Sequence, residues 1–140
     1  MTDIKRILVP VDGSETSDRA IEEAIKIAEV YNSDIHILYV ANINQLAINA
    51  CLSDAILEAV TKAGNEILEK AANEVPEKLN VITTSETGSP SVTITDFADE
   101  IKADLVVIGS RGLGLVKGVL LGSVSQYVVE HAPCPALVVK

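Results

Sequence analysis

Short runs of consecutive apolar residues alternate along the chain with longer segments in which apolar residues recur every three or four positions. The runs are rich in Val, Ile and Leu, which is typical of strands in a parallel sheet that is buried on both faces. They cover residues 7–11, 35–40, 80–86, 105–108 and 136–139. The run at 80–86 is the most polar, because it contains Thr83, Thr84 and Ser85, and this favours an edge position in the sheet.

The longer segments have the spacing of amphipathic helices. They cover residues 15–31, 53–75, 88–101 and 123–130. Ser14 is in position to cap the first helix, and Pro76 marks the end of the second. The apolar stripe predicted for the second helix consists of Ile56, Val60, Ala63, Ile67, Ala71 and Val75.

Strands that alternate with helices predict an α/β fold, in which a five-stranded parallel sheet lies between two layers of helices. The 140 residues fit one domain, residues 1–140. Ligands of such sheets bind at the carboxyl ends of the strands, where the strand order reverses. Two strand ends carry unusual sequence, at 12–14 after the first strand and from Gly109 after the fourth. If one site uses both ends, strands one and four are neighbours, which predicts the order 3-2-1-4-5.

Composition and charge narrow the class of protein further. The chain is 48% apolar with a formal net charge of −9, and its Lys and Arg residues form no cluster. Nucleic acids and anionic membranes attract basic surfaces, so we expect neither as a partner. No apolar stretch is long enough to span a bilayer, and the first residues do not resemble a signal peptide. Cys51 and Cys134 form no CxxC pair, so we expect free thiols and a cytoplasmic protein.

The stretch from Gly109 to Ser123 contains five glycines and lies between a buried strand and a helix. Glycine lets the backbone approach a phosphate closely, and a helix start offers unpaired N–H groups. Ser123 can add a hydroxyl donor, and Ser125 is a candidate for a second. The stretch contains neither a P-loop nor the GxGxxG fingerprint of dinucleotide-binding folds. On these grounds alone, a phosphate site and a mobile loop without a ligand both stay open.

Three separated motifs resemble the ATP-binding branch of the universal stress protein family. The spacing Gly109-x2-Gly112-x9-Gly122-Ser123 is similar to that family's nucleotide motif. The opening residues 7–14 look like its first strand and turn, and residues 131–139 look like its last strand. Only the segment at 41–52 lacks a recognisable match.

The resemblance implies an adenine nucleotide alpha hydrolase-like fold, with ATP at the switch point between strands one and four. The residues that line the adenine and ribose pocket would be Pro10, Val11 and Val40. Asp12 would bind the ribose or a metal ion, Mg²⁺ or Mn²⁺. The residues that meet ribose and phosphates, largely through the main chain, would be Gly109, Arg111, Gly112, Gly122, Ser123 and Val124.

The function expected on this basis is a nucleotide-dependent regulatory protein that responds to stress and acts through an unidentified protein partner. Efficient hydrolysis is not expected, because Asp12 is the one acidic side chain that the pattern assigns to the site. A slow ATPase or another ATP-using enzyme is one alternative, and a nucleotide-free dimeric interaction module is another. The last strand, 136–139, would leave an open sheet edge, so a homodimer joined along this strand is expected. The resemblance also implies homodimers.

Overall fold

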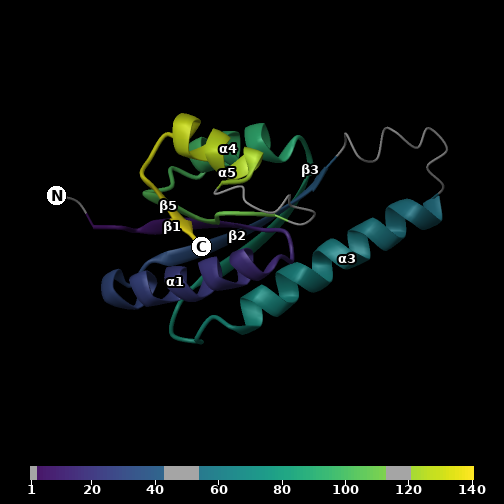
Figure 1. Ribbon diagram of the computed structural model, residues 1–140. Helices are drawn as coiled ribbons and strands as arrows, with labels where there is room; N and C mark the ends of the chain where they lie inside the picture. The colour runs from purple at the N-terminus through teal and green to yellow at the C-terminus, as the bar shows by residue number, and fades with distance from the viewer. Residues whose placement is uncertain (1–2, 43–53, 113–120) are drawn as a thin grey trace.

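The computed structural model describes residues 3–42, 54–112 and 121–140, and it contains a parallel five-stranded sheet with the order β3-β2-β1-β4-β5 (Figure 1). The strands are β1 (Arg6–Val11), β2 (Asp34–Asn42), β3 (Val81–Gly88), β4 (Leu105–Gly109) and β5 (Ala136–Val139). The helices are α1 (Glu15–Tyr31), α3 (Asp54–Asn73), α4 (Pro90–Glu100) and α5 (Ser123–His131). The predicted strand order and the edge position of β3 are therefore confirmed.

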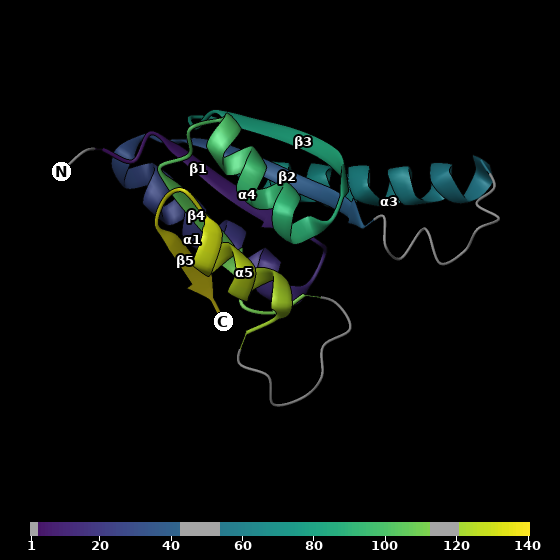
Figure 2. The ribbon, with the colours of Figure 1, turned by 90° about the horizontal axis from the view of Figure 1, so that it is seen from above.

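Helices cover both faces of the sheet, and each face has its own apolar core. On one face α1 and α3 pack against the odd-numbered residues of β1, with Ile7, Val9 and Val11 at the centre. On the other face α4 and α5 pack around Leu8 and Val106. Figures 1 and 2 show the two helical layers on opposite sides of the strands. This confirms the predicted three-layer architecture.

Helix α1 begins and ends where its sequence predicts. The Ser14 hydroxyl accepts a hydrogen bond from the Ser17 N–H at 3.3 Å, as an N-cap does. At the other end Asn32 adopts the left-handed conformation, with φ of 55°, and its N–H bonds to the Ala28 carbonyl. Because both ends are defined by local chemistry, the position of α1's first turn relative to β1 is well specified.

Helix α3 differs in part from its predicted pattern. Ala71 and Val75 are buried and Ile67 packs against the core, as predicted. Ala63, however, is exposed, and Leu68, outside the predicted stripe, is buried. Ile56 lies among the residues whose side chains are outside the described part. Figures 1 and 2 both show the first half of α3 extending beyond the sheet, so an apolar stripe there has no strand to cover. In the described part of the chain, no helix is both long and apolar enough to cross a membrane.

The central strands β1 and β4 are paired over only part of their length. All six residues of β1 pair with β2, but only Ile7 and Leu8 pair with β4. The Arg6 carbonyl accepts a hydrogen bond from the Asp104 N–H, just before β4, whereas the Lys5 carbonyl accepts one from the Asp34 N–H of β2. Because backbone groups alternate in direction along a strand, the even-numbered residues of β1 direct theirs toward β4. Pro10 is such a residue and has no N–H to donate. Pro10 thus cannot continue the ladder as a donor, and the register between β1 and β4 stops at Leu8.

His36 is a half-buried polar residue in an inner strand of this sheet. It lies in β2 between Leu8 of β1 and Ile82 of β3. Its Nδ1 atom is buried and has no hydrogen-bond partner among the described residues. Burial lowers the pKa of the His36 imidazole, which Asp34 partly opposes and Arg6 reinforces. The folded state therefore favours the neutral ring.

We expect the free energy of unfolding to fall as the pH falls below about 6.5, the ordinary pKa of histidine. Below that pH the histidine of the unfolded chain binds a proton, whereas folded His36, with its lowered pKa, stays neutral. The contribution of neutral His36 to stability is therefore present above about pH 6.5 and is lost as the pH falls toward the pKa of the folded state. Urea titrations at pH 7.5 and 5.5 measure the free energy of unfolding at each pH. Between the two pH values, this free energy should fall less for His36→Val than for the wild type. His131→Gln, at an exposed histidine of α5, is the control. Equal losses in wild type and His36→Val would contradict this role.

Candidate functional site

Asp12 and the start of the glycine-rich stretch lie against each other at the carboxyl edge of the sheet. Asp12 directly follows β1, and its Oδ1 accepts a hydrogen bond from the Ser14 N–H at 2.9 Å. Gly112 lies so close that a Cβ added there would be 2.7 Å from Asp12 Oδ2. The structure therefore brings together the two strand ends that the sequence pattern singled out.

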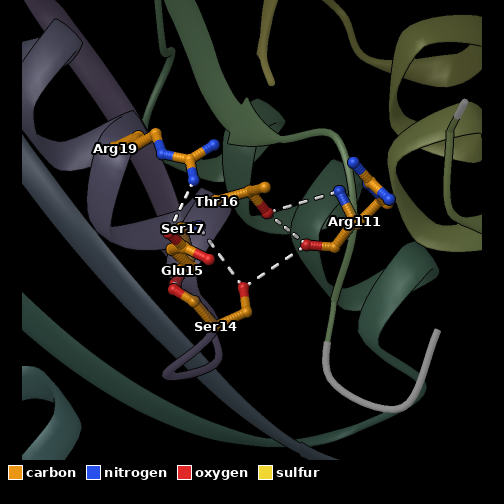
Figure 3. Close-up of polar contacts among 6 residues, drawn as sticks. All are labelled: Ser14, Glu15, Thr16, Ser17, Arg19 and Arg111. Carbon is orange, nitrogen blue, oxygen red and sulfur yellow. Dashed lines mark hydrogen bonds and ion pairs between the residues drawn. The ribbon is translucent and has the colours of Figure 1, made fainter.

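The first turn of α1 holds the main chain of Arg111. The Ser14 hydroxyl donates to the Arg111 carbonyl at 3.3 Å, and the Thr16 hydroxyl donates to the same carbonyl (Figure 3). The Arg111 N–H in turn points at Thr16 Oγ1, 3.4 Å away. Thr16 was not among the residues predicted for the site. A threonine in the first turn of a helix carries no sequence signal for a partner 95 residues away.

Gly109 makes this contact sterically feasible. A Cβ at Gly109 would lie 2.7 Å from the Thr16 carbonyl carbon and 2.8 Å from the Ser17 nitrogen. Both are backbone atoms, which cannot move aside as a side chain can. We expected Gly109 to meet ribose or phosphate through its main chain. The structure adds a separate reason for glycine here, which is the packing of α1 on the end of β4.

Ser110 and Ser125 join the two ends of the stretch. The Ser110 carbonyl accepts from the Gly122 N–H at 2.7 Å and from the Ser125 hydroxyl at 2.9 Å. The Ser110 N–H donates to the Val139 carbonyl of β5 at 2.7 Å. Ser125 is buried, and its hydroxyl also approaches the Gly122 carbonyl at 3.1 Å. The hydroxyl that we considered as a second phosphate donor is thus directed into the protein.

The starts of α1 and α5 are built differently. Helix α1 is capped by Ser14 and carries Glu15 and Asp18 in its first turn, with Glu15 paired to Arg19 at 2.7 Å (Figure 3). Helix α5 starts after Gly122, has no side-chain cap and has no acidic residue in its first turn. A helix start without such groups presents free N–H groups and the positive end of its dipole to an anion. The start of α5 therefore suits an anion better than that of α1.

The other predicted site residues lie along the same strands and helix. Pro10 and Val11 are buried in β1, and Val40 is half-buried in β2. Val124 is half-buried against the core on the α4 and α5 face, while Ser123 is exposed at the start of α5. Arg111 is exposed beside Gly112. Residues 113–120, the middle of the predicted loop, lie outside the described residues.

Asp12 is also a candidate metal ligand. Within residues 3–42, 54–112 and 121–140, no group of three or more His, Cys, Asp or Glu side chains could hold a metal ion. Asp12 supplies a carboxylate, which is a ligand that Mg²⁺ and Mn²⁺ prefer. The residues present therefore fit a metal that takes one protein carboxylate and receives its other ligands from bound phosphates and water.

Alanine at Gly109 and at Gly112 should have different effects. Gly109→Ala forces a methyl group into the α1 backbone and should lower the free energy of unfolding by about 1–3 kcal/mol. Gly112→Ala meets only the Asp12 carboxylate, which can rotate, and should cost less than half as much. Chemical denaturation of the two variants beside the wild type measures both values. Equal costs would contradict the close packing of α1 on β4.

Comparison with known proteins places these features in context. The model of the universal stress protein family matches residues 3–140. The chain is 35% identical over 139 residues to universal stress protein MJ0531 of Methanocaldococcus jannaschii, covering 97% of this chain and 82% of that protein.

Two solved structures have the same fold. The hypothetical protein MJ0577 superposes with a TM-score of 0.89 at 25% identity, over 99% of this chain and 97% of that one. A universal stress protein in complex with cAMP superposes with a TM-score of 0.76 at 28% identity, over 99% of both chains.

Proposed function

The chain belongs to the universal stress protein family, and from this premise we propose that it is a regulatory protein that binds ATP at the switch point between β1 and β4. The contact of Asp12 with Gly112, next to the uncapped start of α5, is the observation that carries the proposal. A carboxylate, a close backbone and a helix start that suits an anion would then lie at one edge of the sheet. The cAMP complex of a relative supports an adenine nucleotide as the class of ligand.

Each part of the nucleotide has a matching chemistry in the proposed site. The apolar residues at the strand ends, Pro10, Val11 and Val40, suit the adenine and ribose rings. The Asp12 carboxylate accepts hydrogen bonds from ribose hydroxyls or holds a Mg²⁺ or Mn²⁺ ion, which would neutralise phosphate charge. The N–H groups at the start of α5 suit the phosphates, as does the exposed Arg111 guanidinium. The main-chain groups in this set are those of Gly109, Gly112, Ser123 and Val124. The Gly122 N–H bonds to the Ser110 carbonyl, so Gly122 would contribute the open space beside the start of α5.

The proposal is one of binding and regulation, with turnover at most slow. Hydrolysis of ATP requires a positioned water and charge neutralisation, usually by metal ions. Among the described residues of the proposed site, Asp12 is the one carboxylate assigned to both tasks. A bound nucleotide can instead report the ATP state of the cytoplasm to a protein partner.

Nucleotide retained by the purified protein is the direct test. Mass spectrometry of denatured wild-type protein should detect ATP, and added ATP should raise the melting temperature. Gly122 has φ of −70° and ψ of 163°, which valine adopts readily, so Gly122→Val should fold normally. Its branched side chain should block approach to the α5 N–H groups and weaken ATP binding at least about tenfold, with Gly122→Ala in between.

The controls separate ATP from its relatives. Titration with cAMP alongside ATP tests the adenine nucleotide class, and phosphate release with Mg²⁺ tests turnover. Binding of cAMP without ATP would overturn the assignment of ATP but keep the site. Absence of bound nucleotide together with no melting shift would leave the nucleotide-free interaction module as the better description.

We also propose a homodimer through β5. This strand pairs with β4 on one side and forms an edge of the sheet on the other. Leu137 is 38% exposed, which is high for a leucine in a strand. An edge of this kind offers unpaired backbone groups to a second chain.

The backbone alternation of β5 gives a sharp test of this interface. The Pro135 and Val139 carbonyls bond to β4, so Val138 directs its N–H to the free edge. Val138→Pro should convert a dimer to a monomer while the fold survives. Leu137→Pro, whose lost N–H faces β4, should instead destabilise the sheet. Light scattering after size exclusion measures the mass, and a monomeric wild type would contradict the proposal.

A further inference from the structure

The polar cluster in Figure 3 joins a helix to a loop that it does not follow in sequence. Ser14 and Thr16 are both buried, at 7% and 8% exposure, and both hydroxyls converge on the Arg111 carbonyl. Thr16 contacts both main-chain groups of Arg111, because the Arg111 N–H also lies 3.4 Å from its Oγ1. The contact therefore restrains the peptide units on both sides of Arg111.

This restraint acts on the residues at the centre of the proposed site. The Arg111 carbonyl faces Ser14 and Thr16, while its guanidinium points away from them (Figure 3). The next residue, Gly112, is the one that lies against Asp12. Rotation of the Arg111 carbonyl away from α1 would move both Arg111 and Gly112.

From this arrangement we propose that Thr16, assisted by Ser14, is a positioning residue for nucleotide binding. It preorganises the main chain of Arg111 and Gly112 so that these residues face the ligand before it arrives. The inference rests on the proposed function, because it assigns a role at the same site. Thr16 itself would not touch the nucleotide.

The physical gain is a smaller loss of conformational entropy on binding. A glycine-rich segment has many backbone conformations, and a ligand that had to order it would bind more weakly. The hydrogen bonds from the first turn of α1 hold the Arg111 main chain in place before a ligand binds. The Ser14 hydroxyl can serve in this way while it accepts the Ser17 N–H, because a hydroxyl both accepts and donates.

Three variants separate the hydroxyl of Thr16 from its packing. Thr16→Val keeps the shape and removes the hydroxyl, whereas Thr16→Ser keeps the hydroxyl. Thr95→Val is the matched control, since Thr95 is equally buried, at 8%, and bonds only to carbonyls within α4. By calorimetry, Thr16→Val should bind ATP about 3–10-fold more weakly, while Thr16→Ser and Thr95→Val should stay within about twofold of wild type.

A second measurement needs no nucleotide. Trypsin cleaves after Arg111, at the peptide bond whose carbonyl Ser14 and Thr16 hold. In ligand-free protein, Thr16→Val should release the peptide that ends at Arg111 several-fold faster than wild type, with Thr95→Val as the control for general loss of stability. Hydrogen exchange at the Gly112 amide should rise in parallel.

The outcomes distinguish this inference from the function on which it rests. If wild type fails to bind ATP, the proposed function fails, and the cleavage rates still decide whether Thr16 orders Arg111. If wild type binds ATP and Thr16→Val matches it in affinity and in cleavage, the positioning role is overturned. Equal losses in Thr16→Val and Thr16→Ser would overturn it as well, because the methyl group or helix packing would then be the cause.

Discussion

The packing of α1 against the end of β4 determines how the residues at the carboxyl edge of the sheet are arranged. It requires a residue without a side chain at Gly109, because the backbone of Thr16 and Ser17 occupies the space that a Cβ would need. Once α1 is this close, the hydroxyls of its first turn reach the Arg111 main chain. The same approach brings Gly112 against Asp12. A single steric condition on one strand thus connects the first loop of the chain to the glycine-rich stretch.

A second condition comes from Pro10, in the middle of the sheet. A proline is rare in a central strand because it cannot donate to the ladder. Here its missing N–H falls on the β4 side, where pairing stops after Leu8, while pairing with β2 continues to the end of β1. The sheet therefore stays continuous on one side of β1 and ends early on the other. Strand ends that are not fully paired can offer backbone groups and the following loops to a ligand, as expected at a switch point.

The charge of the molecule makes these local features more important. With a formal net charge of −9, the protein as a whole repels phosphates, although salt screens this repulsion at distances beyond about 10 Å. An anion must then be held by groups at short range. The start of α5 offers uncapped N–H groups, whereas the start of α1 is occupied by Ser14, Glu15 and the Arg111 carbonyl. The start of α1 therefore contacts the Arg111 main chain, and in the proposed site the start of α5 would receive the anion.

The sequence by itself determined the strands, the helices and the strand order, because apolar runs, caps and glycines act locally and the two polar strand ends pointed to one shared edge. Only the tertiary structure decided which way individual groups face. The Ser125 hydroxyl points into the protein, and Ala63 is exposed. Gly109 packs against the backbone of α1, and Thr16 contacts the Arg111 main chain. Each of these depends on how closely two elements distant in sequence approach. Periodicity assigns a residue to a face of its own element, and it carries no information on the neighbour that this face will meet.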